Sequence, residues 1–167
     1  MTERSPLRIK RATEEDVPLI LTFIRELAQH ERALDRVSAT KEGLQLTLFG
    51  PRPYAEAVIA YESNLPVAFA LYFFSYTSFS AQPGLYIEDI FVCPEKRGFG
   101  VGRQIFAFLA GRAMEQNCAR MEWSVLNWNE PAIHFYENLS AEPVHDWTVF
   151  RLSKDRMAQL AEQTAGD

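Results

Sequence analysis

The sequence predicts one mixed α/β domain, and three observations lead to that prediction. The chain has 167 residues, a length that suits one domain with a substantial buried core. Of these residues 47% are hydrophobic and 23% are charged, which are ordinary proportions for a globular protein. Short runs rich in β-branched and aromatic residues are interspersed with segments that carry apolar residues at helical spacing. Because no repeat or linker-like stretch divides the chain, we expect residues 1–167 to form a single domain.

The first third of the chain predicts one strand followed by two helices. Residues 7–11 alternate apolar and basic side chains, as a strand with one buried face does. The next helix begins after Thr13 or Asp16, and Pro18 favours the later cap because proline is tolerated only in the first helical turn. Its apolar stripe consists of Val17, Ile20, Phe23, Ile24, Leu27 and Ala28. A second helix is expected over residues 40–49.

The middle of the chain predicts three strands. Residues 55–61 and 67–74 are two β-rich runs on either side of a short polar turn at residues 62–66, so we expect a hairpin. A loop is expected over residues 75–84, where Ser, Thr, Gln, Pro and Gly are frequent. Residues 86–92 are mostly apolar, which is typical of a central strand.

The last part of the chain predicts a turn, a helix, a strand, a helix, a strand and a closing helix. These are expected at residues 94–100, 101–116, 121–126, 130–138 and 147–152 and after Ser153. Pro131 falls in the first turn of its helix, where proline is favoured, and Ser153 is a typical N-cap residue.

Composition and charge exclude several classes of function. A formal net charge of -5 argues against nucleic acid as a partner, because phosphate binding needs a basic face. No apolar run approaches the ~18 residues of a membrane span, and residues 1–10 lack the apolar core of a signal peptide. Cys93 and Cys118 form no CxxC pair and no metal-ligand spacing with the three histidines. We therefore expect free thiols, no metal and a cytoplasmic location.

A glycine-rich turn between a strand and a helix is the most informative motif. Residues 92–103 carry three glycines in a GxGxG spacing, together with Lys96, Arg97 and Arg103. Glycines let main-chain N–H groups approach a bound anion, and the helix that follows adds unpaired N–H donors and the positive end of its dipole. The turn lacks the Gly-Lys-Ser/Thr ending of a nucleotide P-loop and the GxGxxG spacing of a dinucleotide-binding turn. It therefore predicts a pyrophosphate site, with a turn that merely contains glycines as the alternative.

Three motifs together resemble a known family. Arg97-x-x-Gly100-x-Gly102 resembles the acyl-CoA-binding signature of the Gcn5-related N-acetyltransferase (GNAT) superfamily. The segments at residues 86–92, 97–102 and 128–136 resemble the diamine acetyltransferases, which include spermidine/spermine N1-acetyltransferases and thialysine N-epsilon-acetyltransferases. This resemblance implies an α/β (α+β) fold whose mostly antiparallel sheet is flanked by helices and has a splayed central strand pair. It also implies an enzyme that transfers an acetyl group from acetyl-CoA to an amine.

The resemblance also implies which residues contact acetyl-CoA. The main chain of the central strand should pair with the pantetheine arm, and the amides of the glycine-rich turn should bind the pyrophosphate. The residues so implied are Ile90, Phe91, Val92, Arg97, Gly98, Phe99, Gly100, Val101, Gly102, Arg103, Asn129 and Ala132.

Two residues are implied to carry the chemistry. Tyr136 matches the proposed general acid, because a phenol beside the sulfur can protonate the departing thiolate. Glu88 matches a carboxylate that removes a proton from the amine, directly or through water. Asp89 is expected on the opposite face of the strand, in a structural salt bridge. We expect direct attack by the amine in a ternary complex, without a cysteine nucleophile.

The identity of the amine is the least specified feature. His30, Glu31 and Glu88 are implied to line the substrate site. Polyamine enzymes carry an aspartate in the stretch that matches residues 76–79, and this chain offers only hydroxyls there, which weakens the prediction of spermidine. A polyamine, a diamine, thialysine or another amino-acid-like amine all stay open, as does an antibiotic. A protein or peptide N-acetyltransferase and a non-catalytic acyl-CoA sensor are alternative functions.

Relatives of this kind are commonly homodimers, so we expect a homodimer here. An apolar run near the C-terminus could form its interface or belong to the core, namely Trp147, Val149, Phe150 and Leu152. Ser140 stands where relatives have glycine after the tyrosine helix, so the turn there is expected to differ.

Overall fold

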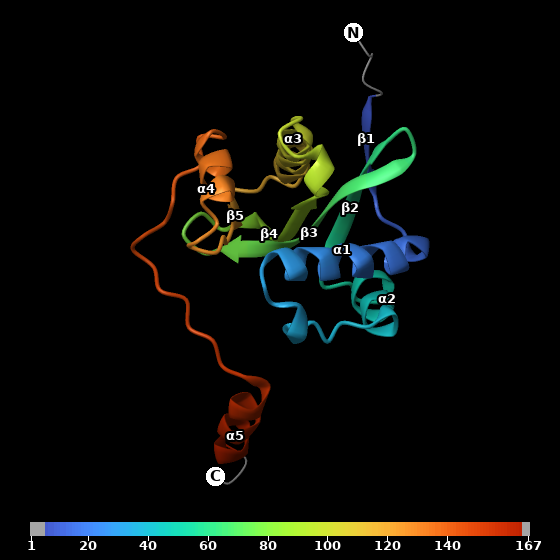
Figure 1. Cartoon of the computed structure of the whole chain (residues 1–167). Helices are drawn as coiled ribbons and strands as arrows, with labels where there is room; N and C mark the ends of the chain where they lie inside the picture. The colour runs from blue at the N-terminus through green and yellow to red at the C-terminus, as the bar shows by residue number, and fades with distance from the viewer. Residues whose placement is uncertain (1–5, 165–167) are drawn as a thin grey trace. The chain divides into compact units, whose positions relative to one another are not determined.

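The protein is described by a computed structural model that covers residues 6–164 (Figure 1). The chain divides into two compact units, one that ends at Asn129 and one that begins at Glu130. The first unit holds a five-stranded sheet and three α-helices, and the second holds two α-helices.

The sheet is mostly antiparallel, as the resemblance implied. Its strands are β1 (Leu7–Arg11), β2 (Glu56–Glu62), β3 (Leu65–Thr77), β4 (Gln82–Val92) and β5 (Met121–Trp123). They lie in sequence order, so each strand pairs with its neighbour along the chain. Only the β4–β5 pair is parallel, because the helix α3 carries the chain back to the same end of the sheet.

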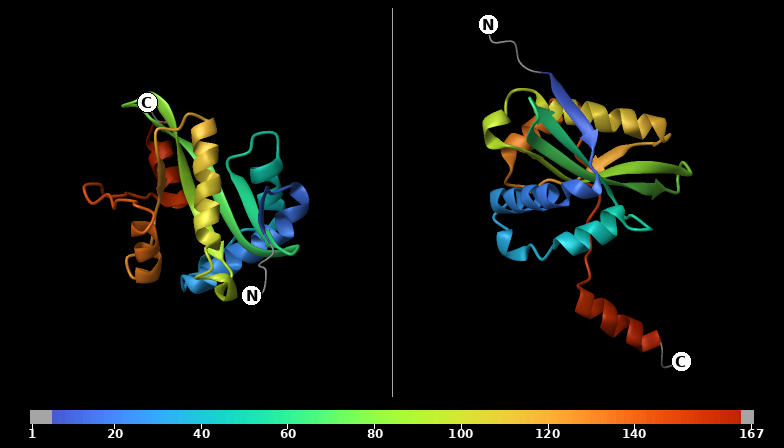
Figure 2. Two further views of the ribbon diagram at one scale, coloured as in Figure 1. Left: turned by 90° about the horizontal axis from the view of Figure 1, so that it is seen from above. Right: turned by 90° about the vertical axis from the view of Figure 1, so that its right-hand side faces the viewer.

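Helices cover both faces of this sheet (Figure 2). The helices α1 (Val17–His30) and α2 (Lys41–Phe49) lie on one face, and α3 (Val101–Glu115) lies on the other. The core under α1 includes Phe23, whose ring stacks on Phe69 of β3 with the centroids 5.2 Å apart. Phe91 of β4 packs into the same cluster, so residues of β4 on the side of Phe91 face α1.

Both residues proposed as caps of the first helix have a role. Thr13 caps a short 3₁₀ turn at Glu14–Asp16, where its N–H donates to Asp16 Oδ2 at 2.8 Å. The α-helix then begins at Val17 with Pro18 in its first turn, as predicted. Thr40 caps α2, and its hydroxyl accepts a hydrogen bond from the N–H of Gly43 at 3.1 Å.

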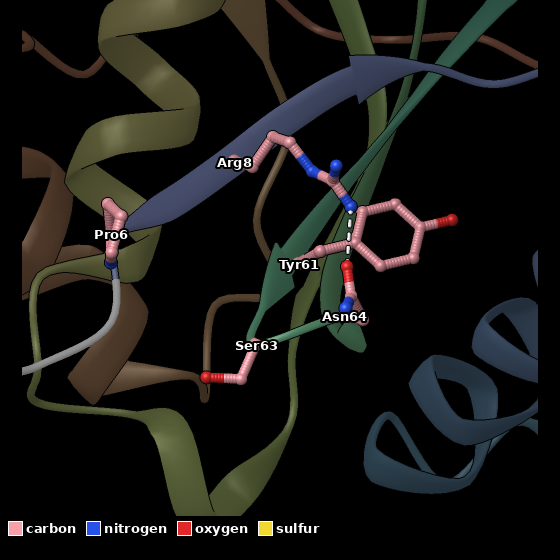
Figure 3. Close-up of a pocket in the computed structure, with 5 residues that line it drawn as sticks. All are labelled: Pro6, Arg8, Tyr61, Ser63 and Asn64. Atoms are coloured by element: carbon pink, nitrogen blue, oxygen red, sulfur yellow. Dashed lines mark hydrogen bonds between the residues drawn. The ribbon is translucent and has the colours of Figure 1, made fainter.

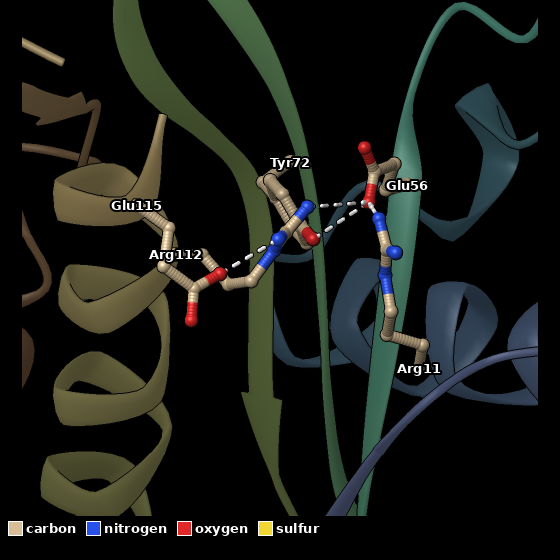
Figure 4. A network of polar contacts seen from close by, with 5 residues as sticks. All are labelled: Arg11, Glu56, Tyr72, Arg112 and Glu115. Atoms are coloured by element: carbon tan, nitrogen blue, oxygen red, sulfur yellow. Dashed lines mark hydrogen bonds and ion pairs between the residues drawn. The ribbon is translucent and has the colours of Figure 1, made fainter. Parts of the chain in front are cut away.

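A polar network attaches the C-terminal end of α3 to the sheet (Figure 4). Glu56 of β2 accepts a hydrogen bond from the hydroxyl of Tyr72 at 2.9 Å and pairs with Arg11. Arg112 of α3 approaches the same carboxylate at 3.8 Å and donates to Glu115 at 2.8 Å. Burial alone would raise the pKa of Glu56, but the bonds from Arg11 and Tyr72 hold the pKa of this carboxyl below its ordinary value. The helix that begins at the glycine-rich turn is therefore fixed at its far end.

Two boundaries in the middle of the chain differ from prediction. The loop expected over residues 75–84 is wrong, because β3 runs to Thr77 and β4 begins at Gln82, so the turn holds only residues 78–81. Pairing with the opposite strand satisfies the main chain there, and this outweighs the polar composition. The β2–β3 turn also narrows to Ser63 and Asn64, both with positive φ, as two-residue hairpin turns require.

The second unit contains α4 (Glu130–Glu137) and α5 (Lys154–Thr164). Ser153 caps α5 as predicted, because its hydroxyl accepts from the N–H of Arg156 at 3.4 Å. The strand expected at residues 147–152 is wrong, since this segment pairs with no strand in the described part of the chain. A strand needs a paired neighbour as well as β-prone residues. Trp147 and Phe150 are 77% and 91% exposed, so the segment is not core.

Candidate active site

A β-bulge in the middle of β4 shapes the candidate site. Asp89 lies opposite Leu71 and Ile87 lies opposite Tyr72, so Glu88 between them has no partner on β3. The two-residue alternation of side chains fails at such a point. It follows that the alternation argument for placing Glu88 and Asp89 on opposite faces does not apply here. Asp89 instead shares a face with Phe91, which is the face that α1 covers.

The strands β4 and β5 separate at the bulge, which confirms the predicted splay. Their parallel pairing ends at Ile87 and Trp123. The N–H of Cys93 donates to the carbonyl of Val67 at 2.9 Å, so alternation along this antiparallel pair directs the main-chain groups of Phe91 to β3 and those of Ile90 and Val92 to the open side. Phe91 lies between Ile90 and Val92 and pairs with β3. Ile90 therefore offers its N–H and carbonyl to an extended ligand, and Val92 offers its N–H, because the Val92 carbonyl accepts from Arg97.

The glycine-rich turn follows this open edge directly. A 3₁₀ turn at Pro94–Lys96 leads to Gly98 and Gly100, whose φ values are 76° and 83°. Side chains rarely accept such angles, and a Cβ built on either glycine meets no atom within 4 Å. The helix α3 then begins at Val101, with Gly102 and Arg103 in its first turn. Open space above two left-handed glycines at a helix N-terminus fits a bound phosphate group.

The basic residues of the turn have separate roles. Arg97 donates from Nε to the carbonyl of Val92 at 2.9 Å, and its guanidinium lies over the ring of Phe91. It therefore braces the turn against β4. Lys96 pairs with Glu62 of β2, which partly neutralises its charge. Arg103 lies exposed on the first turn of α3, and Phe99 is about half exposed beside it.

Two surface hollows lie near β1. One has a volume of about 500 Å³ and adjoins the glycine-rich turn; it is lined by Pro6, Leu7, Glu62, Lys96, Phe99, Val101 and Gln104. The other, of about 230 Å³, is lined by Pro6, Arg8, Tyr61, Ser63 and Asn64 (Figure 3). There Arg8 donates to Asn64 at 3.0 Å and lies over the ring of Tyr61. This second hollow belongs to the β1 edge of the sheet, so it is separate from the open edge of β4.

Three carboxylates gather between the C-terminal end of α1 and the bulge. Burial, reinforced by the negative charges of Glu88 and Glu31, raises the pKa of the Asp89 carboxyl to about 6. Burial likewise raises the pKa of Glu31, although His30 beside it acts in the opposite direction. Glu88 on the bulge is exposed. The region therefore carries concentrated negative charge, which suits a cationic ligand.

Asp89 has no cationic partner in the described part of the chain, so the structural salt bridge expected for it is wrong. A partly buried carboxylate without a cation is costly, and such residues are frequent at functional sites. The bulge that turns Asp89 toward α1 leaves no signature in the sequence. The only hint was a pair of adjacent acids in an apolar strand.

The aromatic side of this region was missed by the sequence prediction. Trp128 is 47% exposed, its ring lies 6.4 Å from that of His30, and the guanidinium carbon of Arg32 lies 5.2 Å from its centroid. On the same face as Asp89, Tyr86 hydrogen-bonds Ser124 at 2.7 Å and its ring contacts Phe73. Trp128 begins the motif at residues 128–136 but was given no role, and Arg32 was not singled out, because their contact joins segments about a hundred residues apart.

The other predicted site residues lie at the junction and in the second unit. Asn129 ends the first unit, and its N–H donates to the carbonyl of Leu126 at 2.8 Å. Ala132 and Tyr136 lie on α4, where the ring of Tyr136 contacts that of Phe135 with the centroids 5.4 Å apart. The carbonyl of Tyr136 accepts from the N–H of Leu139 at 2.9 Å, so this residue belongs to the last turn of the helix.

Neither sulfur nor metal chemistry is evident in the described residues. Burial raises the pKa of the Cys93 thiol, which disfavours the nucleophilic thiolate. Across residues 6–164, no group of three or more His, Cys, Asp or Glu side chains is placed to hold a metal ion. Over the same residues, none of the helices is long and apolar enough to cross a bilayer.

Comparison with known proteins identifies the family. Residues 22–140 match the Acetyltransferase (GNAT) family, a span that includes the bulge, the glycine-rich turn and α4. The chain belongs to this family. It is accordingly an enzyme of the acetyl-CoA-dependent acyltransferase class.

The curated relatives act on amines. The chain is 34% identical to thialysine N-epsilon-acetyltransferase of Bos taurus, over 92% of its own length and 96% of the relative. It is 30% identical to L-ornithine N5-acetyltransferase of Arabidopsis thaliana, over 92% and 87%. Among solved structures, an integron cassette protein of V. cholerae superposes with a TM-score of 0.78 at 23% identity, covering 93% of this chain and 98% of that one. The structural likeness establishes the fold.

Proposed function

We propose that this GNAT enzyme transfers the acetyl group of acetyl-CoA to a primary amine of a small molecule. One observation carries the proposal: the open edge of β4 lies between a left-handed glycine turn that fits a phosphate and a bulge that carries two carboxylates. The first feature suits the coenzyme and the second suits a cationic acceptor. The names of the relatives, which act on thialysine and ornithine, agree with a small amine.

The residues of the first unit fit the coenzyme. Ile90 and Val92 would hold the pantetheine arm through their main chain, and Gly98 and Gly100 would admit the pyrophosphate. When bound, acetyl-CoA supplies an acetyl thioester, whose carbonyl carbon accepts the amine. Asn129 and Ala132 are further proposed contacts from the segment that precedes and begins α4.

The protein moves protons on both sides of this transfer. An ammonium ion has no lone pair, so Glu88 takes a proton from it, directly or through water. Asp89 and Glu31 add negative potential that attracts the cation to the site. The phenol of Tyr136 donates a proton to the sulfur as the thiolate departs, so the amine attacks directly and no acyl-enzyme forms.

Replacing Tyr136 by Phe tests the proton donor. We expect turnover to fall by about 10²–10⁴-fold, the usual contribution of a general acid, while acetyl-CoA affinity changes little. Thiol release in a steady-state assay and acetyl-CoA titration by calorimetry measure the two quantities. Phe135→Leu, on the same helix, is the control for altered packing. An unchanged turnover would remove Tyr136 from the mechanism.

The proposed reaction is tested by measuring release of coenzyme A thiol from acetyl-CoA across a panel of acceptors. The panel holds spermidine, putrescine, thialysine, lysine, ornithine, an aminoglycoside and a peptide with a free N-terminus. Release with a small amine supports the proposal. Release with the peptide alone would indicate a protein N-acetyltransferase, and binding of acetyl-CoA without release to any acceptor would indicate a sensor. Failure to bind acetyl-CoA would contradict the proposal at its base.

We also propose a homodimer in the cytoplasm. Residues 144–152 expose apolar side chains that a partner copy could cover, including Trp147, Val149 and Phe150. Light scattering after size exclusion should give twice the monomer mass, and Phe150→Asp should reduce it. Met114→Asp, at an exposed position on α3, is the matched control. A monomer at micromolar concentration would refute the dimer.

A further inference from the structure

Arg32 is held in an unusual backbone conformation at the C-terminal end of α1. Its φ is 58°, in the left-handed region that glycine normally occupies at this point of a helix. The N–H of Ala33 donates to the carbonyl of Ala28 at 2.8 Å, and the N–H of Arg32 donates to that of Gln29 at 3.1 Å. These bonds close the helix and fix the direction in which Arg32 leaves it. An arginine at such a position costs stability relative to glycine.

The guanidinium of Arg32 stacks on Trp128. The distance from its central carbon to the ring centroid is 5.2 Å, within the range of a cation–π contact. No carboxylate of the described residues forms an ion pair with it, although Glu31 is its neighbour in the chain. A guanidinium that lies on an aromatic face keeps its N–H donors free at the edge. Arg32 is thus positioned by contact with a ring and retains its hydrogen-bonding capacity.

Negative charge lies near Arg32 in the chain and beyond it on β4. Glu31 precedes it, and the charge of Glu31 reaches Asp89 on the bulge of β4. The region therefore holds carboxylates together with a guanidinium that is fixed on Trp128. A ligand that carries an ammonium and a carboxylate matches this arrangement, because planar carboxylates accept two parallel hydrogen bonds from a guanidinium. A diamine or polyamine bears only positive charge, so it gains nothing from Arg32 and is repelled by it.

We infer that Arg32 is a specificity-determining residue: it binds the carboxylate of the acceptor and so favours an amino acid with a side-chain amine over a diamine of the same length. This inference rests on the proposed function and narrows it to one substrate class. Arg32 determines specificity through binding, whereas Glu88 and Tyr136 serve the proton transfers. Trp128 positions the guanidinium.

Matched substrates isolate the contribution of the carboxylate. Ornithine and putrescine differ only in that group, as do lysine and cadaverine. We expect the native enzyme to have a lower KM for the amino acid of each pair. Arg32→Asn removes the cation but keeps the turn, since asparagine tolerates left-handed backbone. It should raise the KM for ornithine and lysine by about 10-fold to 100-fold, the value of a charged hydrogen-bonded pair, with kcat little changed. The KM for the two diamines should stay level or fall.

Two further variants separate binding from a general loss of structure. Arg32→Lys keeps the charge without the planar fork, so it should give an intermediate KM for the amino acids. Arg36→Asn, at another exposed arginine in the segment that follows α1, should leave the KM for all of these amino acids and diamines unchanged. Unfolding temperatures measured for all variants report any damage to the fold.

The outcomes distinguish this inference from the proposed function. If Arg32→Asn raises the KM of ornithine and putrescine equally, or of neither, the assignment of Arg32 is overturned. Preference of the native enzyme for putrescine and cadaverine would overturn it as well. If acetyl-CoA binds but no small amine is acetylated, the proposed function fails instead. Calorimetric titration with ornithine and putrescine then decides the role of Arg32 alone, because equal affinities would refute it without any turnover.

Discussion

Replacing Asp89 by Asn should stabilise the protein, and the gain should depend on pH. The pKa of this carboxyl rises from 3.8 to about 6 on folding, so between these values the native state holds a proton that the unfolded state has lost. Stability then falls as the pH rises, because the unfolded state binds fewer protons. A difference of about 2.2 in pKa, at about 1.4 kcal/mol for each tenfold change in proton affinity, amounts to about 3 kcal/mol. Asparagine never ionises, so Asp89→Asn escapes this loss.

Urea unfolding at a series of pH values tests the reasoning. About 2 of the 3 kcal/mol should appear between pH 4.5 and 7.5 as a widening gap in unfolding free energy between the variant and the native protein. Asp35→Asn, which replaces an exposed acid after α1, should show no such gap. In a Glu31→Gln background, the difference in unfolding free energy made by Asp89→Asn should be smaller, because one of the charges that raise the pKa of Asp89 is gone. Parallel curves for Asp89→Asn and the native protein across this range would refute the argument.

Three other substitutions test separate features of the molecule. Glu56→Gln should cost about 1–3 kcal/mol in unfolding free energy, because Tyr72 and Arg11 lose a charged acceptor. The control Glu115→Gln, at the exposed end of that network, should cost less than about 1 kcal/mol. Urea unfolding at pH 7 compares the two variants. Ser140→Gly should raise stability by about 0.5–1 kcal/mol, because Ser140 holds a φ of 63°, and calorimetric melting detects the gain. Gly100→Val should weaken acetyl-CoA binding at least tenfold, because it places a branched side chain at a φ of 83°. The control Gly111→Ala, in the middle of α3, should leave the affinity unchanged. Calorimetric titration with acetyl-CoA measures both. Native affinity in a folded Gly100→Val protein would contradict the phosphate assignment.

Local signals in the sequence predicted most of the fold. The stripe from Val17 to Ala28 and the caps at Asp16 and Ser153 predicted helices where the structure has them, because helix periodicity and capping are short-range properties. Strand ends were predicted less well, since a strand forms where a partner pairs with it. The polar residues of β3 and β4 near the hairpin turn form strands because they pair with each other. Residues 147–152 are β-prone but have no pairing partner in the described chain.

Short-range features of the candidate site were likewise predicted from the sequence, whereas its long-range contacts were not. The glycine turn was visible in the sequence, because Gly98 and Gly100 mark a contiguous motif whose backbone needs glycine. The role of Asp89 could not be predicted, since it depends on one unpaired residue in β4 and on charge from the end of α1. The contact of Arg32 with Trp128 is likewise tertiary. Long-range geometry of this kind carries the acceptor specificity that we propose, whereas the proposed phosphate site is encoded by neighbouring residues.

The bulge in β4 adds one residue without exchanging the faces of the strand on either side. Tyr86 and Asp89 lie three residues apart, a spacing that places residues of a regular strand on opposite faces. They share a face here because the bulged Glu88 shifts the alternation by one residue. Deleting Glu88 would leave Tyr86 and Asp89 on their present face. Deleting Ile90 would instead shift the rest of β4 by one residue, so that Phe91 would turn from the core to the opposite face. Glu88 thus sets which side chains of β4 face α1 on both sides of the bulge.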